Sequence, residues 1–214
     1  MNPAKEQLIR FWKENFHFRE QEIQAFSELN REEFLPEEFR EKAYEDRPQP
    51  LLRGKTISQP TTVMIMTSAL ELKPGERVFE VGTGSGYQAA MIGKIVGPSG
   101  KVVSTEIIPE LVNMGRTHLK KAGITNVVVF EENGAQGHAK EALFDKIIIT
   151  AACKEFPKPL LEQLKPGGII VGPVGTREEQ EMIKGVKDEQ GRLRRELLGP
   201  FLFTPMYGSY GFEV

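Results

Sequence analysis

The sequence has little of what several protein classes require. It contains one cysteine, Cys153, which excludes an internal disulfide, and its three histidines form no pair at the spacing of a metal site. No apolar run approaches the roughly 20 residues that cross a bilayer. The first residues carry charges through their apolar positions, unlike a signal peptide. We therefore expect no metal and no membrane segment, and we expect the protein in the cytoplasm.

The charge is nearly balanced. There are 28 lysines and arginines against 30 aspartates and glutamates, a formal net charge of -2. A protein that binds nucleic acid mainly through phosphates usually carries a clear excess of basic residues, so no nucleic acid partner is expected. The 214 residues, 39% of them hydrophobic, are enough for one domain over residues 1–214. We expect that domain to be a monomer.

The apolar pattern changes along the chain. Residues 3–45 repeat apolar positions at helical spacing, which predicts a cap of short amphipathic helices. Residues 47–60 are rich in proline and form a long loop, and Pro60 suits the first turn of a helix that runs to about Leu72. Short β-branched runs then follow, separated by helical stretches, and they predict strands at 77–81, 101–106, 126–131, 145–150 and 168–174.

These runs are apolar without alternation, as in a parallel sheet that helices cover on both faces. The fold class is therefore α/β, with a doubly wound, mostly parallel Rossmann-like sheet. Residues 178–203 read as two strands around a polar turn and predict an antiparallel hairpin at one edge of the sheet. On this division, residues 1–60 supply the helical cap and a functional loop, and residues 61–214 supply the α/β core.

The sharpest motif is FEVGTGSGY at residues 79–87, between a predicted strand and a predicted helix. Gly82, Gly84 and Gly86 allow a tight turn and a close approach of the backbone to a ligand at a helix N-terminus. A dinucleotide fingerprint would need a third glycine where this chain has Tyr87, and Glu80 would repel a pyrophosphate. The same carboxylate favours a cofactor with a cationic amine, as in S-adenosylmethionine.

Glu106 ends the second predicted strand, where an acid accepts hydrogen bonds from ribose hydroxyls. Both adenosine cofactors use such an acid, so Glu106 does not discriminate between them.

Several segments together resemble the protein-L-isoaspartate O-methyltransferase family. They are AYEDRPQP at 43–50, ISQP at 57–60, EVGTGSGYQAA at 80–90, VVSTE at 102–106, KIIITAA at 146–152, LLEQLKPGGIIVGPVG at 160–175 and TPMYGSYGF at 204–212. The resemblance covers about residues 31–212. It implies a class I methyltransferase fold and methyl transfer from S-adenosyl-L-methionine, with S-adenosyl-L-homocysteine as product and no metal. The acceptor is the α-carboxylate of an L-isoaspartyl residue in a damaged protein or peptide, whose ester then closes to a succinimide.

The resemblance also implies roles for individual residues. Ser58 matches the active-site serine of the family, and its hydroxyl is expected to donate a hydrogen bond to the substrate carboxylate. The alternative is that Ser58 only satisfies backbone groups ahead of the Pro60 helix. The expected cofactor-binding residues are Ile57, Ser58, Glu80, Gly82, Thr83, Gly84, Gly86, Glu106, Ile107, Asn133 and Gly134.

The chain departs from the family at Asn133, where Asp is usual, and we expect the Asn133 carbonyl to meet the adenine amino group. The substrate peptide is expected between the 47–60 loop and the segment 204–212. Two alternatives stay open at this point. One is a class I methyltransferase with an RNA or small-molecule acceptor, and the other is a non-catalytic module that binds S-adenosylmethionine.

Overall fold

The computed structural model describes residues 2–213, and a seven-stranded sheet in the order β5-β4-β3-β6-β7-β8-β9 forms its centre. Five strands run parallel: β3 (Arg77–Val81), β4 (Lys101–Glu106), β5 (Val127–Glu131), β6 (Phe144–Ile149) and β7 (Leu164–Gly175). β8 (Gln180–Lys187) and β9 (Leu193–Phe201) continue the sheet as an antiparallel hairpin. The predicted fold class is confirmed, although β7 begins at Leu164 rather than at residue 168.

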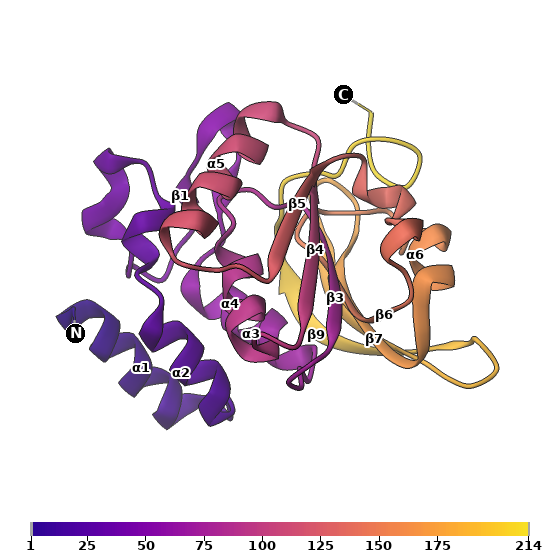
Figure 1. Cartoon of the computed structure of the whole chain (residues 1–214), viewed down its shortest axis with the longest axis horizontal. Helices are drawn as coiled ribbons and strands as arrows, with labels where there is room; N and C mark the ends of the chain where they lie inside the picture. The colour runs from indigo at the N-terminus through magenta and orange to yellow at the C-terminus, as the bar shows by residue number, and fades with distance from the viewer. Residues whose placement is uncertain (1, 214) are drawn as a thin grey trace.

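Helices cover both faces of the sheet, as the unbroken apolar strands predict. α3 (Pro60–Ala69), α4 (Tyr87–Val96) and α5 (Pro109–Lys121) lie on one side, and α6 (Lys158–Gln163) lies on the other (Figure 1). Neighbouring strand residues point to opposite faces. Val78 belongs to the core under α3, α4 and α5, whereas Phe79 belongs to the core under α6. The four residues 78–81 of β3 are therefore all buried, and alternation is absent there.

The N-terminal cap packs on helices rather than on the sheet. α1 (Pro3–Asn15) and α2 (Glu20–Glu28) lie outside α3 and α4, with α2 in contact with both (Figure 1). Two 3-10 helices follow, Arg31–Phe34 and Glu37–Lys42. The fully buried Trp12 donates from Nε1 to Thr61 Oγ1 at 2.7 Å, which anchors α1 to the first turn of α3. The cap thus holds the start of the helix that follows the 47–60 loop.

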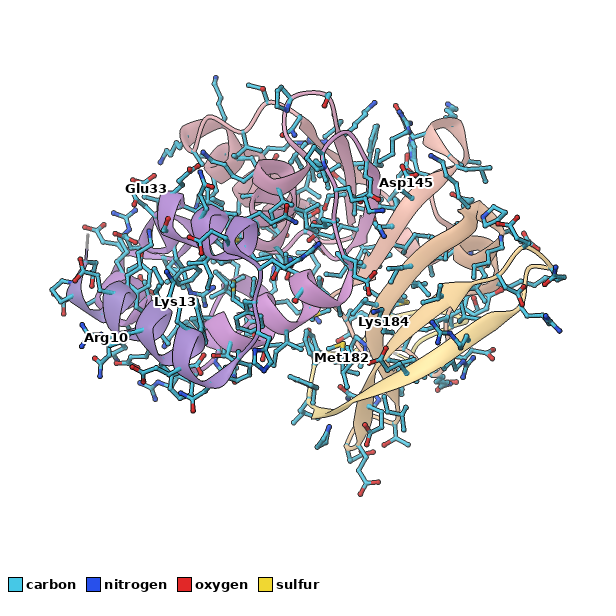
Figure 2. The ribbon with its side chains drawn as sticks, turned by 90° about the horizontal axis from the view of Figure 1, so that it is seen from below. Arg10, Lys13, Glu33, Asp145, Met182 and Lys184 are labelled. Atoms are coloured by element: carbon cyan, nitrogen blue, oxygen red, sulfur yellow. The ribbon has the colours of Figure 1, made fainter. Side chains whose placement is uncertain are left out.

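Within that loop, β1 (Gln49–Pro50) and β2 (Thr56–Ile57) pair as a small antiparallel hairpin. Next to the edge strand β9, Lys184 of β8 forms an ion pair with Glu71, just after α3, and Met182 is buried in the core below α3. Figure 2 shows both residues on the hairpin, away from Arg10 and Lys13 of α1. Over the described residues, none of the helices has the length and apolar character of a membrane span.

Candidate active site

A cavity opens at the carboxyl ends of the parallel strands, where β3 has β4 on one side and β6 on the other. In doubly wound sheets this switch point is the usual place for a ligand. The cavity holds about 960 Å³ of empty space, part of it open to solvent. Its walls come from the loops after β3, β4, β5 and β6, from residues 55–58, and from residues 204–207.

The glycine loop after β3 forms the floor of this cavity. Gly82, Gly84 and Gly86 have φ angles of 95°, 53° and 85°, a region that residues with a Cβ rarely adopt. The N–H groups of Gly82 and Thr83 donate to Thr105 O at 2.9 and 3.1 Å, and Gly84 N–H donates to Glu106 Oε2 at 3.0 Å. A loop that cradles phosphate would leave such amides free for the anion. This loop uses them within the protein, which disfavours a pyrophosphate ligand.

Glu106 lies at the end of β4, with its side chain in the cavity wall and only 8% exposed. Its Oε1 accepts from Ile107 N–H at 2.9 Å and from Ile108 N–H at 3.1 Å. A carboxylate has about four acceptor sites, so these bonds and the one from Gly84 fix its orientation and leave capacity for one more donor. The Ile107 side chain is 45% exposed beside it and presents an apolar surface to the cavity. A hydroxyl donor and a flat apolar ring fit this pair.

The loop after β5 supplies another part of the wall through Asn133 and Gly134. A Cβ on Gly134 would collide with Thr105 Oγ1 and would lie 2.7 Å from Val81 Cγ1, so only glycine keeps this wall flat. Asn133 Oδ1 accepts from Ala135 N–H at 3.0 Å and caps the short helix that follows. This bond uses one of the two acceptor positions of the Asn133 carbonyl, so its expected contact with the adenine amino group stays a prediction.

Two of the predicted cofactor-binding residues lie outside the cavity wall. Gly86 faces α5, where a Cβ would stand 3.2 Å from both Gly115 O and Leu119 Cγ, so its role is close helix packing. Glu80 is fully buried in β3 and accepts a hydrogen bond from Ser104 Oγ. The pKa of Glu80 is raised to about 8, mainly by burial and also by the nearby charge of Glu106, against the lowering effect of the Ser104 hydrogen bond. Glu80 lies beneath the loop because β3 turns its side chain toward β4, so it makes no direct contact with the cavity.

Ile57 and Ser58 reach the cavity from β2 and the residue after it. The Ser58 hydroxyl makes no hydrogen bond with any other residue in the range 2–213. Ser58 is not the N-cap of α3 either, because that position is Gln59, whose side chain makes no capping hydrogen bond. Ser58 is instead held by its backbone, because Arg31 Nη2 donates to Ser58 O at 2.7 Å. Its hydroxyl is thus left available to a ligand.

Arg31 is itself fully buried, and its Cζ lies 4.9 Å from the centroid of the Tyr87 ring. Its Nε donates to Ala43 O at 2.7 Å. Burial lowers the pKa of Arg31 to about 10, which still leaves it charged at neutral pH. This buried cation joins the cap to the backbone of Ser58.

The cavity wall also contains residues to which the sequence analysis assigns no role. Gln88 from α4 and Thr150 after β6 belong to it, as does Lys55. Thr150 Oγ1 donates to Gly82 O at 2.7 Å, so the end of β6 supports the glycine loop. The C-terminal segment is fixed beside β6 by hydrogen bonds from Ala152 N–H to Thr204 O at 2.9 Å and from Met206 N–H to Ala152 O at 2.8 Å. Over residues 2–213, no three His, Cys, Asp or Glu side chains converge as a metal site would require.

The parallel sheet with its antiparallel hairpin and the internally bonded glycine loop define a class I methyltransferase. The family model described as "Protein-L-isoaspartate(D-aspartate) O-methyltransferase (PCMT)" matches residues 3–210. The chain belongs to the protein-L-isoaspartate O-methyltransferase family.

Three similar proteins illustrate the match. A protein-L-isoaspartate O-methyltransferase of Methanopyrus kandleri is 43% identical over 212 residues, which cover 98% of this chain and 94% of the relative. A solved protein-L-isoaspartate O-methyltransferase superposes with a TM-score of 0.84 at 27% identity, over 96% of this chain and 66% of that longer one. A Plasmodium falciparum structure, described as a putative member in complex with S-adenosyl-L-homocysteine, gives a TM-score of 0.83 at 22% identity, over 97% and 99% of the two chains. That last likeness concerns the fold.

Proposed function

We propose that the protein transfers a methyl group from S-adenosylmethionine to the α-carboxylate of L-isoaspartyl residues in damaged proteins and peptides. The observation that carries this proposal is the placement of the free Ser58 hydroxyl and the glycine loop in one cavity, in a chain of this family. The resulting methyl ester closes spontaneously to a succinimide, which begins repair of the damaged bond.

The cavity wall fits the cofactor. Glu106 has acceptor capacity for one ribose hydroxyl, and the apolar surface of Ile107 suits one face of an adenine ring. Gly134 keeps its part of the wall flat, and Gly82, Thr83 and Gly84 support the methionine part. S-adenosylmethionine supplies an electrophilic methyl group on its sulfonium, and the S–CH₃ bonding pair stays on sulfur as the carboxylate oxygen forms the new bond.

The chain has only to bind and orient the acceptor. A carboxylate with an ordinary pKa near 3.5 to 4 is already ionised at neutral pH, so no general base is needed. Ser58 donates a hydrogen bond to one carboxylate oxygen and directs the other toward the methyl group. Arg31 fixes the Ser58 backbone, and such positioning alone contributes several kcal/mol to catalysis, up to about 7–11 kcal/mol in the best cases.

The substrate peptide lies between the 47–60 loop and the segment 204–212 in this proposal. Residues 55–58 and 204–207 both line the cavity, which supports the placement. We further propose that residues 1–214 act as one domain and as a monomer, and that no nucleic acid takes part. Cytoplasmic location stays a prediction from the sequence, which cell fractionation would check.

The test compares the wild-type protein with Ser58→Ala. Labelled methyl incorporation from S-adenosylmethionine into an isoaspartyl peptide should fall at least about tenfold in S58A, because a hydrogen bond to a charged group is worth about 1.5–3 kcal/mol. The affinity for S-adenosylhomocysteine, measured by calorimetry, should stay within about twofold. If cofactor binding is lost with S58A, Ser58 contacts the cofactor and the assigned role is wrong. If wild-type protein labels neither an isoaspartyl nor an aspartyl peptide, the proposed function itself fails.

A further inference from the structure

The charged residues of the cavity wall are two acids and one base. Three charged residues line it: Lys55, Glu106 and Glu132. Glu106 is held by three backbone N–H groups, so its charge is already matched by donors within the protein. Lys55 is the one basic residue of the wall among residues 2–213. Among the side chains of this wall, an anionic substrate therefore meets a single cation, Lys55.

The backbone of Lys55 is fixed by the β1–β2 hairpin. Its carbonyl accepts from Leu51 N–H at 2.7 Å, and its own N–H donates to Leu52 O at 3.1 Å. It begins the run of four consecutive residues, 55–58, that line the cavity and end at Ser58. The neighbouring Arg53 is engaged elsewhere, because it forms an ion pair with Glu110 of α5. The hairpin thus places one lysine, and not the nearby arginine, at the wall that also carries Ser58.

The Lys55 side chain is half-buried, and its Nζ lies 4.7 Å from the centroid of the Tyr207 ring. Tyr207 belongs to the C-terminal segment, which also lines the cavity. Lys55 forms no ion pair with any carboxylate of residues 2–213. An aromatic face attracts an ammonium but leaves its N–H donors able to bind an anion. The cation is held in place and has no counter-ion.

We propose that Lys55 binds the α-carboxylate of the isoaspartyl substrate and makes the enzyme select a carboxylate over a neutral amide, an inference that rests on the proposed function. A carboxylate that enters a partly dry cavity loses hydration, and a charge-assisted hydrogen bond from an ammonium offsets that loss. The methyl ester product is neutral, so the same interaction disappears once the reaction is complete. Lys55 therefore holds the substrate and releases the product.

The charge change of the reaction predicts which kinetic constant depends on Lys55. The carboxylate loses negative charge as the new O–CH₃ bond forms, so an ammonium binds the ground state at least as well as the transition state. Such binding lowers KM and does not raise kcat. Lys55→Gln should therefore raise KM for an isoaspartyl peptide about tenfold and leave kcat unchanged or slightly higher.

The deciding experiment uses two peptides of one sequence, an isoaspartyl peptide and its α-carboxamide analogue, each titrated into protein that is saturated with S-adenosylhomocysteine. Wild type should bind the carboxylate form about tenfold more tightly than the carboxamide. K55Q should lose this preference, and K55R should keep most of it. Lys154→Gln is the matched control, because Lys154 also lies over an aromatic ring, at 5.7 Å from the centroid of Phe212, but outside the cavity wall.

The inference is overturned if K55Q keeps the wild-type preference, or if K154Q loses it to the same extent. It is also overturned if K55Q lowers kcat and leaves KM unchanged. These outcomes differ from a failure of the proposed function, in which wild-type protein methylates no isoaspartyl peptide at all. Raising the salt concentration should weaken peptide binding more in wild type than in K55Q, since the charge of Lys55 is partly exposed to solvent.

Discussion

Glu80 is the group whose charge should most affect the stability of the fold. It is fully buried in β3, where Ser104 Oγ donates to one carboxylate oxygen and the other oxygen has no partner within residues 2–213. Burial raises the pKa of Glu80 from its ordinary value of 4.5 to about 8. The folded protein therefore holds a proton at neutral pH that the unfolded chain releases.

The sign of the effect follows from this difference. Between about pH 4.5 and pH 8 the folded state binds more protons at Glu80 than the unfolded state, so stability falls as the pH rises through this window. One pH unit of this difference corresponds to about 1.4 kcal/mol. From pH 6 to pH 8 the Glu80 carboxyl should therefore reduce the free energy of unfolding by about 2 kcal/mol, and the loss should level off above about pH 8.

Glu80→Gln keeps the shape and the acceptor for Ser104 but cannot ionise. Urea unfolding of both proteins can be followed between pH 6 and pH 9 by the fluorescence of Trp12, the only tryptophan, which is buried. The stability of E80Q relative to wild type should rise by about 2 kcal/mol between pH 6 and pH 8. Glu131→Gln, at an exposed position, is the control and should show no such trend. A difference between wild type and E80Q that stays constant with pH would refute the argument.

Three further substitutions probe the cavity. Gly134→Ala places a methyl group against β3 and β4 and should weaken S-adenosylhomocysteine binding at least about tenfold in calorimetry, whereas unchanged affinity would remove Gly134 from the cofactor wall. Asn133→Asp keeps the cap on Ala135 and adds a free charged acceptor, so affinity for the same ligand should rise several-fold, and a fall would contradict the role given to this wall. Arg31→Lys removes the guanidinium that donates to Ser58 O, so kcat should fall about tenfold while cofactor affinity is retained. An equal loss of kcat and of cofactor affinity would indicate a purely structural role for Arg31.

The strands of the core were predictable because burial on both faces of the sheet produces unbroken apolar runs in the sequence. The runs at 77–81 and 101–106 are strands over those same residues, since unbroken β-branched sequence between polar turns has few alternatives. β7 starts earlier than predicted because Leu164 pairs with Phe144 before a bulge, and the Lys165–Gly168 run that follows looks like a turn in sequence. Local composition cannot reveal pairing with a distant strand.

The site was predictable where strand order alone decides it. Glu106 and the glycine loop follow neighbouring parallel strands, whose carboxyl ends must meet. The direction in which a side chain points was harder to predict from the sequence. Glu80 and Ser104 are opposite each other in the β3–β4 register, which turns the Glu80 carboxylate into the protein and away from the ligand. The engagement of the Asn133 carbonyl with Ala135 likewise depends on a turn that only the structure reveals.

The most direct test of the central claim is a mass-spectrometric time course with two peptides that differ only in carrying isoaspartate or normal aspartate. With S-adenosylmethionine present, the isoaspartyl peptide alone should gain the mass of one methyl group, and the ester should then decay to the succinimide. Fragmentation should place the ester on the isoaspartyl residue. Equal methylation of both peptides, or of neither, would contradict the account.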